Sequence, residues 1–287
     1  MSEKIYFNTS KKFSIKRTLV NVGTRLHHTV APKHAEKVAR KLLLTPVRSK
    51  PKNEEPSGLI KGELQTSEGR LKTYQLGSGP VWLLTHGWSG SSNQFFPLME
   101  HIAGQGFTAL AYDHPAHGDS EGVYGHIPSF VRGLESVIDS IEDLAGVVGH
   151  SMGTAAVLEC RHQKLHDCPL LLIAPVLEYL ENLFGSLQRS GYSMKLFNAV
   201  ASELEVQYHY PLQSIDPYRK LAARNGPTII VHDEQDKFSP FNVSRKAADE
   251  MPGVTLVATQ GQGHGRIMTS EQVMHSFNTL NASLLSE

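Results

Sequence analysis

The residues best suited to chemistry lie around one serine, in the run Gly149-His150-Ser151-Met152-Gly153. An apolar stretch over 144–148 precedes this run, and small residues at helical spacing follow it. The order predicts a strand, a sharp turn and a helix, an arrangement that holds a nucleophilic serine in a strained conformation with its hydroxyl exposed. Larger side chains at Gly149 and Gly153 would collide with the turn. A flexible loop is the alternative interpretation, and the flanking strand and helix argue against it.

A serine at such a turn needs a base, an acid that orients the base, and N–H groups that hold an oxyanion. The run around Ser151 resembles the nucleophile elbow of the α/β-hydrolases, in which an Asp or Glu and then a His follow the serine along the chain. The resemblance extends over roughly residues 41–287, with five motifs in the family's order. Residues 43–48 resemble the lead-in of a bacterial esterase-like subgroup.

The resemblance implies the remaining members of a catalytic triad. The family places its acid four residues after a strand-end His, and His232 followed by Asp236 fits this pattern. We therefore assign the acid to Asp236 and expect Asp233 and Glu234 to belong to a solvated acidic loop. The base is assigned to His264, which follows the last predicted strand in a glycine-rich loop.

The oxyanion hole is expected to use two backbone N–H groups. One belongs to Met152, directly after the nucleophile, and the other to Trp88 in the segment His86-Gly87-Trp88, which resembles the family's His-Gly loop. The loop from Asp113 to Ser120 resembles a structural turn of the family, with an alanine where glycine is usual. His150, and His117 in that turn, are expected to support the site by hydrogen-bonding to loops.

Apolar runs and helical patterns alternate along most of the chain. The expected strands are a hairpin over 63–76 and runs over 81–85, 107–112, 144–148, 170–173, 228–231 and 254–258; the expected helices span 94–102, 129–144, 243–250 and the segment from 270. This alternation predicts an α/β protein with a mostly parallel central sheet flanked by helices. The sequence over 176–215 has helical spacing only. It predicts a small helical cap inserted into an α/β-hydrolase domain of residues 53–287.

Residues 1–52 form a basic arm. They contain 13 lysines and arginines against two glutamates, a net charge of +11, so the remainder of the neutral chain carries −11. Leu19, Val22 and Leu26 recur at helical spacing, and Val38 belongs to a second such pattern, which predicts two amphipathic helices. We favour packing of these helices on the acidic remainder of the chain, with Leu19, Val22 and Val38 buried. The alternatives are peripheral contact with an anionic membrane and a mitochondrial transit peptide.

The amino-acid composition excludes several classes of protein and partner. Apolar residues make up 40% of the chain and charged residues 20%, as in soluble globular proteins, and the sequence contains no apolar run of about 18 residues that would predict a transmembrane segment. Two cysteines form no disulfide framework, and a cytoplasmic location is expected. No nucleic-acid motif and no metal-ligand spacing occur, so neither a nucleic-acid partner nor a metal or other cofactor is expected.

The resemblance therefore implies a serine hydrolase that cleaves a small-molecule carboxylic ester through an acyl-enzyme intermediate. A thioesterase, an amidase or a carbon–carbon hydrolase would use the same triad. A ligand-binding protein without catalysis is an alternative from another class, because a fold by itself does not determine function. Neither the substrate nor the oligomeric state follows from the sequence.

Overall fold

The computed structural model of the protein describes residues 15–48 and 50–284, and the side chains within 18–48 and 50–282. The expected residues 1–14 of the arm, and Ser49, lie outside the described residues. The chain forms two compact units. Among the described residues, one contains 46–48, 50–177 and 217–284, and the other contains 15–45 and 178–216.

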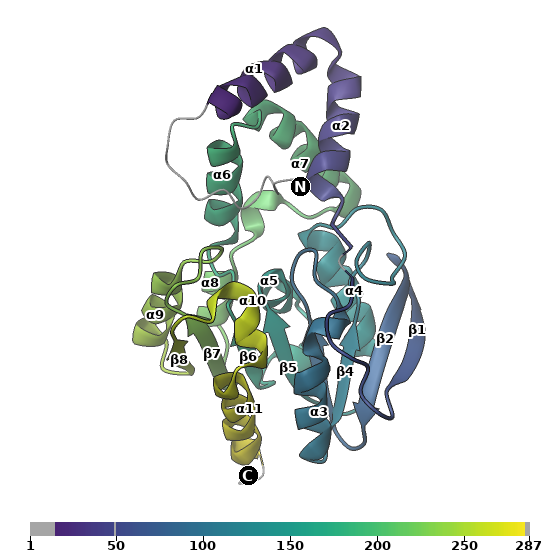
Figure 1. Cartoon of the computed structure of the whole chain (residues 1–287), viewed down its shortest axis with the longest axis vertical. Helices are drawn as coiled ribbons and strands as arrows, with labels where there is room; N and C mark the ends of the chain where they lie inside the picture. Colours follow the sequence, from purple (N-terminus) through teal and green to yellow (C-terminus); the bar gives the residue numbers. More distant parts are fainter. Residues whose placement is uncertain (1–14, 49, 285–287) are drawn as a thin grey trace. The chain divides into compact units, whose positions relative to one another are not determined.

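The larger unit is built on one eight-stranded sheet (Figure 1). Its strands are β1 Ile60–Thr66, β2 Gly69–Gly77, β3 Val81–Thr85, β4 Thr108–Tyr112, β5 Leu144–His150, β6 Leu170–Ile173, β7 Thr228–Asp233 and β8 Val254–Thr259, in the spatial order β1-β2-β4-β3-β5-β6-β7-β8. The hairpin β1–β2 and the pair β2–β4 are antiparallel, and the other neighbours are parallel. The predicted mostly parallel sheet is confirmed.

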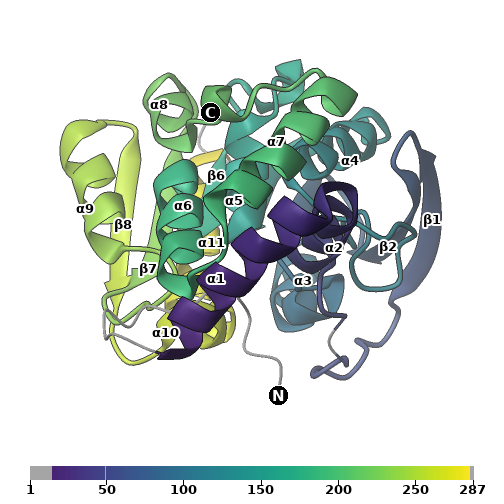
Figure 2. The same cartoon turned by 90° about the horizontal axis from the view of Figure 1, so that it is seen from above.

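Helices cover both faces of this sheet, as Figure 2 shows from above. One face carries α3 Phe96–Gly104 and α11 Glu271–Leu284; the other carries α4 Ile127–Asp139, α5 Met152–Glu159, α8 Pro217–Ala222 and α9 Phe241–Glu250. The predicted helix over 129–144 ends early, at Asp139. The Ser140 hydroxyl donates to the carbonyl of Val137 at 2.7 Å, and such a local bond competes with helix continuation. The chain then enters β5 at Leu144.

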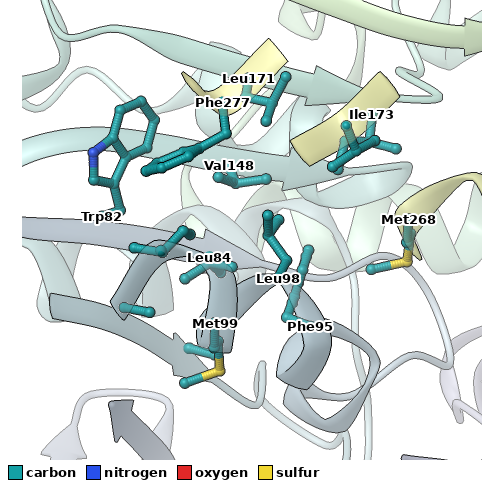
Figure 3. Packing of buried hydrophobic residues seen from close by; sticks show 14 of the residues in the cluster. Trp82, Leu84, Phe95, Leu98, Met99, Val148, Leu171, Ile173, Met268 and Phe277 are labelled. Atoms are coloured by element: carbon teal, nitrogen blue, oxygen red, sulfur yellow. The ribbon is translucent and has the colours of Figure 1, made fainter. Parts of the chain in front are cut away.

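The main core lies between the sheet and the pair α3 and α11 (Figure 3). Alternate residues of the central strands point into it, among them Leu84, Val148 and Leu171, because successive side chains of a strand face opposite sides. Trp82 meets Phe277 of α11 edge to face, with ring centroids 4.9 Å apart. This core fixes the parallel strands whose carboxyl ends carry the site.

The smaller unit is helical. It contains the arm helices α1 Ile15–Val30 and α2 Pro32–Leu44 together with the cap helices α6 Tyr179–Ser190 and α7 Met194–Tyr208. Asn21 donates from its side-chain amide to the carbonyl of Gly191 at 3.0 Å, and Arg40 forms an ion pair with Glu203 and hydrogen-bonds Gln207. The arm therefore packs against the cap segment. Among the described residues, no helix combines the length and the apolar character needed to cross a membrane.

The arm uses a different face for this packing from the one expected. Leu19, Val22 and Val38 are 67%, 58% and 41% exposed, so the prediction that they are buried is wrong. The buried residues of α2 include Ala39 and Leu43 instead. Small alanines let two helix backbones approach closely, and the apolar periodicity of the sequence cannot tell which of two faces finds a partner.

The orientation of α2 predicts a large loss of stability for one of two adjacent leucines and a small loss for the other. Leu43 is 1% exposed and Leu42 is 48% exposed. We expect Leu43→Ala to lower the free energy of unfolding by about 2–5 kcal/mol, because it leaves a cavity. Leu42→Ala, the matched control, should cost less than about 1 kcal/mol. Urea unfolding followed by circular dichroism measures both, and equal losses would contradict this orientation.

Candidate active site

Ser151 sits at the turn between β5 and α5 with a strained backbone. Its φ of 53° and ψ of −123° lie outside the regions that L-residues normally populate, at a cost of about 1–3 kcal/mol. Neither flanking glycine could carry a side chain unless its neighbours shifted. A Cβ at Gly153 would lie 2.4 Å from the carbonyl oxygen of Thr85, and one at Gly149 would lie 3.1 Å from the Cα of Thr154. The turn expected from the sequence is present.

Three predicted site residues form one chain of hydrogen bonds. The Ser151 hydroxyl lies 2.8 Å from Nε2 of His264, and Nδ1 of His264 lies 2.7 Å from Oδ2 of Asp236. With Nδ1–H donating to the carboxylate, Nε2 is left as an acceptor for the serine proton. These residues follow β5, β8 and β7, whose parallel carboxyl ends meet at one edge of the sheet. The arrangement can deprotonate a serine during nucleophilic attack.

Asp236 is held as a carboxylate by several donors. Its side chain is fully buried, and its Oδ1 accepts the backbone N–H of Phe238 at 2.7 Å. Burial alone would raise the pKa of Asp236. Hydrogen bonds from His232 and His264, with the nearby charge of His264, outweigh this and hold the pKa well below its usual range. The side chain therefore stays ionised at neutral pH.

Two residues around Asp236 were not assigned a site role from the sequence. His232 lies with Nε2 3.3 Å from Oδ2 of Asp236 and with Nδ1 2.7 Å from the hydroxyl of Ser244. Ser239 donates its hydroxyl to the same carboxylate oxygen at 3.2 Å. The four-residue spacing from His232 to Asp236 identified Asp236 as the acid. The same spacing could have identified His232 as a partner of that carboxylate.

Asp233 is a buried structural carboxylate, so the expectation of a solvated position is wrong. Its Oδ2 accepts the N–H of Gln262 at 2.8 Å and the hydroxyl of Thr259 at 2.9 Å, and its Oδ1 accepts the N–H of Gln235. Burial raises the pKa of Asp233, but these donors lower it below its usual range overall. The carboxylate thus ties the end of β7 to the segment that carries His264. Glu234 is exposed, as expected.

The segment around His264 is more ordered than the predicted loop. It forms the one-turn helix α10 Gly263–Arg266. His150 donates from Nε2 to the carbonyl of His264 at 2.9 Å and so contacts this segment. A hollow of about 550 Å³ borders His264 and is lined by polar and cationic side chains that include Gln262 and Lys237. Water can reach His264 from this side.

The predicted oxyanion loop lies against the nucleophile. A Cβ at Gly87 would be only 2.7 Å from the Cβ of Ser151, so only glycine permits this approach. The carbonyl of Gly87 accepts Nδ1–H of His86 at 2.8 Å and the N–H of Gly90 at 3.0 Å. Because a trans peptide is planar, the next N–H, that of Trp88, points away from these donors. Met152 is the first residue of α5, where N–H groups have no acceptor within the helix.

The turn from Asp113 to Ser120 packs against the oxyanion loop. The buried carboxylate of Asp113 accepts the N–H of Ser92 at 2.7 Å and the N–H of Asp119 at 2.8 Å. Ala116 has a φ of +67°, the left-handed conformation that the family's glycine would adopt without strain. His86 joins this turn to the oxyanion loop, since its Nε2 accepts the N–H of His114 at 3.1 Å. His117 donates from Nδ1 to the carbonyl of Pro115 at 2.9 Å.

Buried neutral histidines surround the site. Burial lowers the pKa of His150 to about 3 and that of His117 to about 3, and it also lowers the pKa values of His86 and His114. In the unfolded chain a histidine binds its proton near pH 6.5. Between pH 6.5 and the lower pKa of the folded protein, the unfolded state binds more protons than the folded state does. The free energy of unfolding is therefore highest above pH 6.5 and decreases as the pH falls.

The neutral state of His117 predicts a measurable pH effect. Each such histidine should remove about 1.4 kcal/mol of stability per pH unit between pH 6.5 and 3. We expect His117→Asn, which keeps a donor for Pro115, to reduce the slope of unfolding free energy against pH by about this amount between pH 6 and 4.5. His275→Asn, at an exposed position of α11, should leave the slope unchanged. Urea titrations at several pH values measure both, and equal slopes in the wild type and His117→Asn would refute the buried neutral state.

No metal site accompanies these histidines in the part of the chain that the structure describes. Within residues 15–48 and 50–284, no three His, Cys, Asp or Glu side chains are grouped so that they could hold a metal ion. One ring nitrogen each of His86, His117 and His150 hydrogen-bonds a backbone carbonyl, and Nδ1 of His232 hydrogen-bonds the hydroxyl of Ser244.

The sheet order, the elbow and the chain order of the site residues define an α/β-hydrolase. Residues 80–225, about half of the chain, match the sequence model of the family Hydrolase_4, described as serine aminopeptidase, S33. The protein belongs to this family of serine α/β-hydrolases.

Three known proteins illustrate the similarity. Human monoglyceride lipase is 32% identical over 132 residues, which cover 43% of this chain and 43% of the lipase. The match thus spans less than half of that relative. Monoacylglycerol lipase of Mycolicibacterium smegmatis is 23% identical over 219 residues, covering 60% of this chain and 75% of that lipase. The structure of an esterase of Pyrococcus furiosus superposes with a TM-score of 0.63 at 17% identity, over 84% of this chain and 97% of the esterase, and so shows the fold.

Proposed function

We propose that the protein is a serine hydrolase that cleaves carboxylic esters through an acyl-enzyme intermediate. The observation that carries this proposal is the unbroken hydrogen-bond chain from Ser151 through His264 to the buried carboxylate of Asp236. A solvated serine is a weak nucleophile, and a positioned base with an oriented tautomer is the usual way to activate it.

In the acylation step, Ser151 attacks the carbonyl carbon of the ester. His264 accepts the serine proton at Nε2 and then delivers it to the leaving alcohol. The ionised Asp236 keeps the other ring nitrogen protonated and stabilises the imidazolium that forms. The N–H groups of Met152 and Trp88 would hold the oxyanion, supported by the approach of Gly87 to Ser151 and by the position of Met152 at the start of α5.

In the deacylation step, a water molecule takes the place of the alcohol. His264 removes a proton from this water, which attacks the acyl carbon, and the proton then returns to the oxygen of Ser151 as the acid leaves. The polar hollow beside His264 supports this step because it gives water a route to the base. Each of the two steps thus begins and ends with a neutral histidine.

The preference for esters rests on the relatives. The two curated relatives are a monoglyceride lipase and a monoacylglycerol lipase, and the superposed structure is that of an esterase. A glycerol monoester of a fatty acid is therefore the first substrate class to test. Thioesters and amides would react through the same groups, and the family's description as serine aminopeptidases makes an amide the informative comparison.

A substrate panel tests the proposal directly. It contains p-nitrophenyl esters of increasing acyl length, a 1-monoacylglycerol, a thioester and an aminoacyl p-nitroanilide. We expect kcat/KM for at least one ester to exceed that for the anilide by more than about a hundredfold, since an amide is the less reactive carbonyl. Faster turnover of the anilide would make the protein a peptidase. Absence of turnover together with absence of labelling by a fluorophosphonate would favour a binding protein.

A further inference from the structure

The helix α1 presents an apolar stripe to solvent. Leu19, Val22, Leu26 and Val30 are 67%, 58%, 61% and 75% exposed. At about 100° per residue, their spacing of three, four and four places all four side chains within an arc of about 80° on one side of the helix. Isolated exposed apolar residues are ordinary, but an ordered row along one helix indicates a surface that meets an apolar partner.

The smaller unit does not use this stripe for its own contacts. In α2 the buried residues include Ala35, Ala39 and Leu43, and α1 is joined to the cap segment through Asn21, which lies on another side of the helix. The apolar stripe of α1 therefore remains exposed when the four helices pack together.

Both arm helices carry exposed cations. Residues 15–45 contain seven lysines and arginines against one glutamate, a net charge of +6. Lys33, Lys37 and Lys41 recur every fourth residue of α2 and are exposed, as is Arg25 on α1. Arg40 is engaged with Glu203 of α7, so it belongs to the packing of the unit. The exposed cations would repel a second copy of the same surface and would attract a negatively charged one.

We propose that α1 docks in the plane of an anionic lipid bilayer, with Leu19, Val22, Leu26 and Val30 at the boundary between headgroups and acyl chains and with exposed cations of the two arm helices, Arg25 among them, attracted to the lipid phosphates. An amphipathic helix with an apolar row and a cationic flank is the form that binds at such interfaces. Lysines and arginines near an anionic leaflet add attraction that falls off within a Debye length. The proposal is independent of the reaction at Ser151.

The test measures binding of the full-length protein to vesicles. Vesicles of phosphatidylglycerol and phosphatidylcholine, and vesicles of phosphatidylcholine alone, are sedimented with the wild type and with the triple variant Leu19→Gln/Val22→Gln/Leu26→Gln. We expect the wild type to bind the anionic vesicles, and the triple variant to lose at least about tenfold in partition coefficient. The matched control is Ile60→Gln/Val123→Gln/Val206→Gln, at positions 62%, 64% and 75% exposed elsewhere, which should bind as the wild type does.

A second variant tests the cations separately. Lys33→Gln/Lys37→Gln/Lys41→Gln should bind the two kinds of vesicle with a smaller difference in affinity than the wild type does, because it removes three of the seven positive charges of residues 15–45. Raising the salt to 0.5 M should reduce wild-type binding in the same direction, since it shortens the Debye length.

Three results would overturn the proposal. The wild type could fail to bind either kind of vesicle, or the apolar triple variant could bind as well as its control. The apolar triple variant could instead melt several degrees below its control or turn a dimer into a monomer, which would show that the stripe is covered by the chain itself or by a second copy. Circular dichroism melts and light scattering of all four proteins supply these readouts.

Discussion

Replacing Ser151 by alanine is expected to abolish ester turnover and labelling by a fluorophosphonate. The hydroxyl is the atom that Nε2 of His264 approaches at 2.8 Å, and alanine offers no nucleophile there. Loss of a nucleophile in a triad typically leaves only the contribution of the oxyanion hole and of substrate binding, so kcat should fall by about 10⁴-fold or more. Initial rates with the best ester of the panel, and in-gel fluorescence of the labelled protein, measure the two effects.

The same substitution should leave the fold intact or stabilise it slightly. Ser151 is only partly buried, and alanine has a similar size. A melting temperature close to that of the wild type would show that activity is lost at the site and not through unfolding. Labelling that persisted in Ser151→Ala would place the nucleophile elsewhere and contradict the proposal.

Replacing Asp236 by asparagine is expected to lower kcat by about 10³–10⁴-fold. An amide in place of the buried carboxylate can donate to Nδ1 of His264, which would shift the ring proton to Nε2 and leave no acceptor for the serine proton. The imidazolium that forms during attack would also lose its counter-charge. Steady-state rates of the purified variant measure the effect, and KM should change much less than kcat.

Asp233→Asn is the matched comparison three residues away. Asp233 accepts hydrogen bonds from Gln262 and Thr259, so its replacement should lower stability while reducing kcat much less, by about tenfold at most. The two variants should thus separate, with Asp236→Asn losing activity and Asp233→Asn losing stability. A larger fall in kcat for Asp233→Asn would mean that the acid had been assigned three residues too late.

Much of the sheet could be predicted from the sequence, because its signals are local. Buried parallel strands read as short apolar runs bounded by turns, and the runs ending at Thr85, Ile173 and Val231 needed no tertiary information. The order of the elbow serine, the acid and the base along the chain follows from the order of the strands that carry them. The resemblance to the α/β-hydrolases, whose acid and base follow the serine in this order, made Ser151, Asp236 and His264 the expected partners before any distance was known.

Only the tertiary structure decided which polar groups are buried and what they contact. Asp233 and Glu234 are adjacent and chemically alike, yet one is buried under four donors and the other is exposed. The contact of His232 with Asp236 likewise depends on the path of the chain between them. Burial and partners are properties of the packed chain, because desolvation depends on every element that covers a group.

The arm shows the same division most clearly. The sequence by itself determined that residues 15–44 are helical and amphipathic, since periodicity and the position of Pro32 are local properties. Which face of each helix is covered depends on the shape of its neighbour. Small Ala35 and Ala39 lie buried in α2, while the larger Leu19 and Val22 remain exposed on α1. The hydrophobicity of a side chain determines how much its burial would stabilise the fold. Which side chains are buried depends instead on complementary packing with the cap helices.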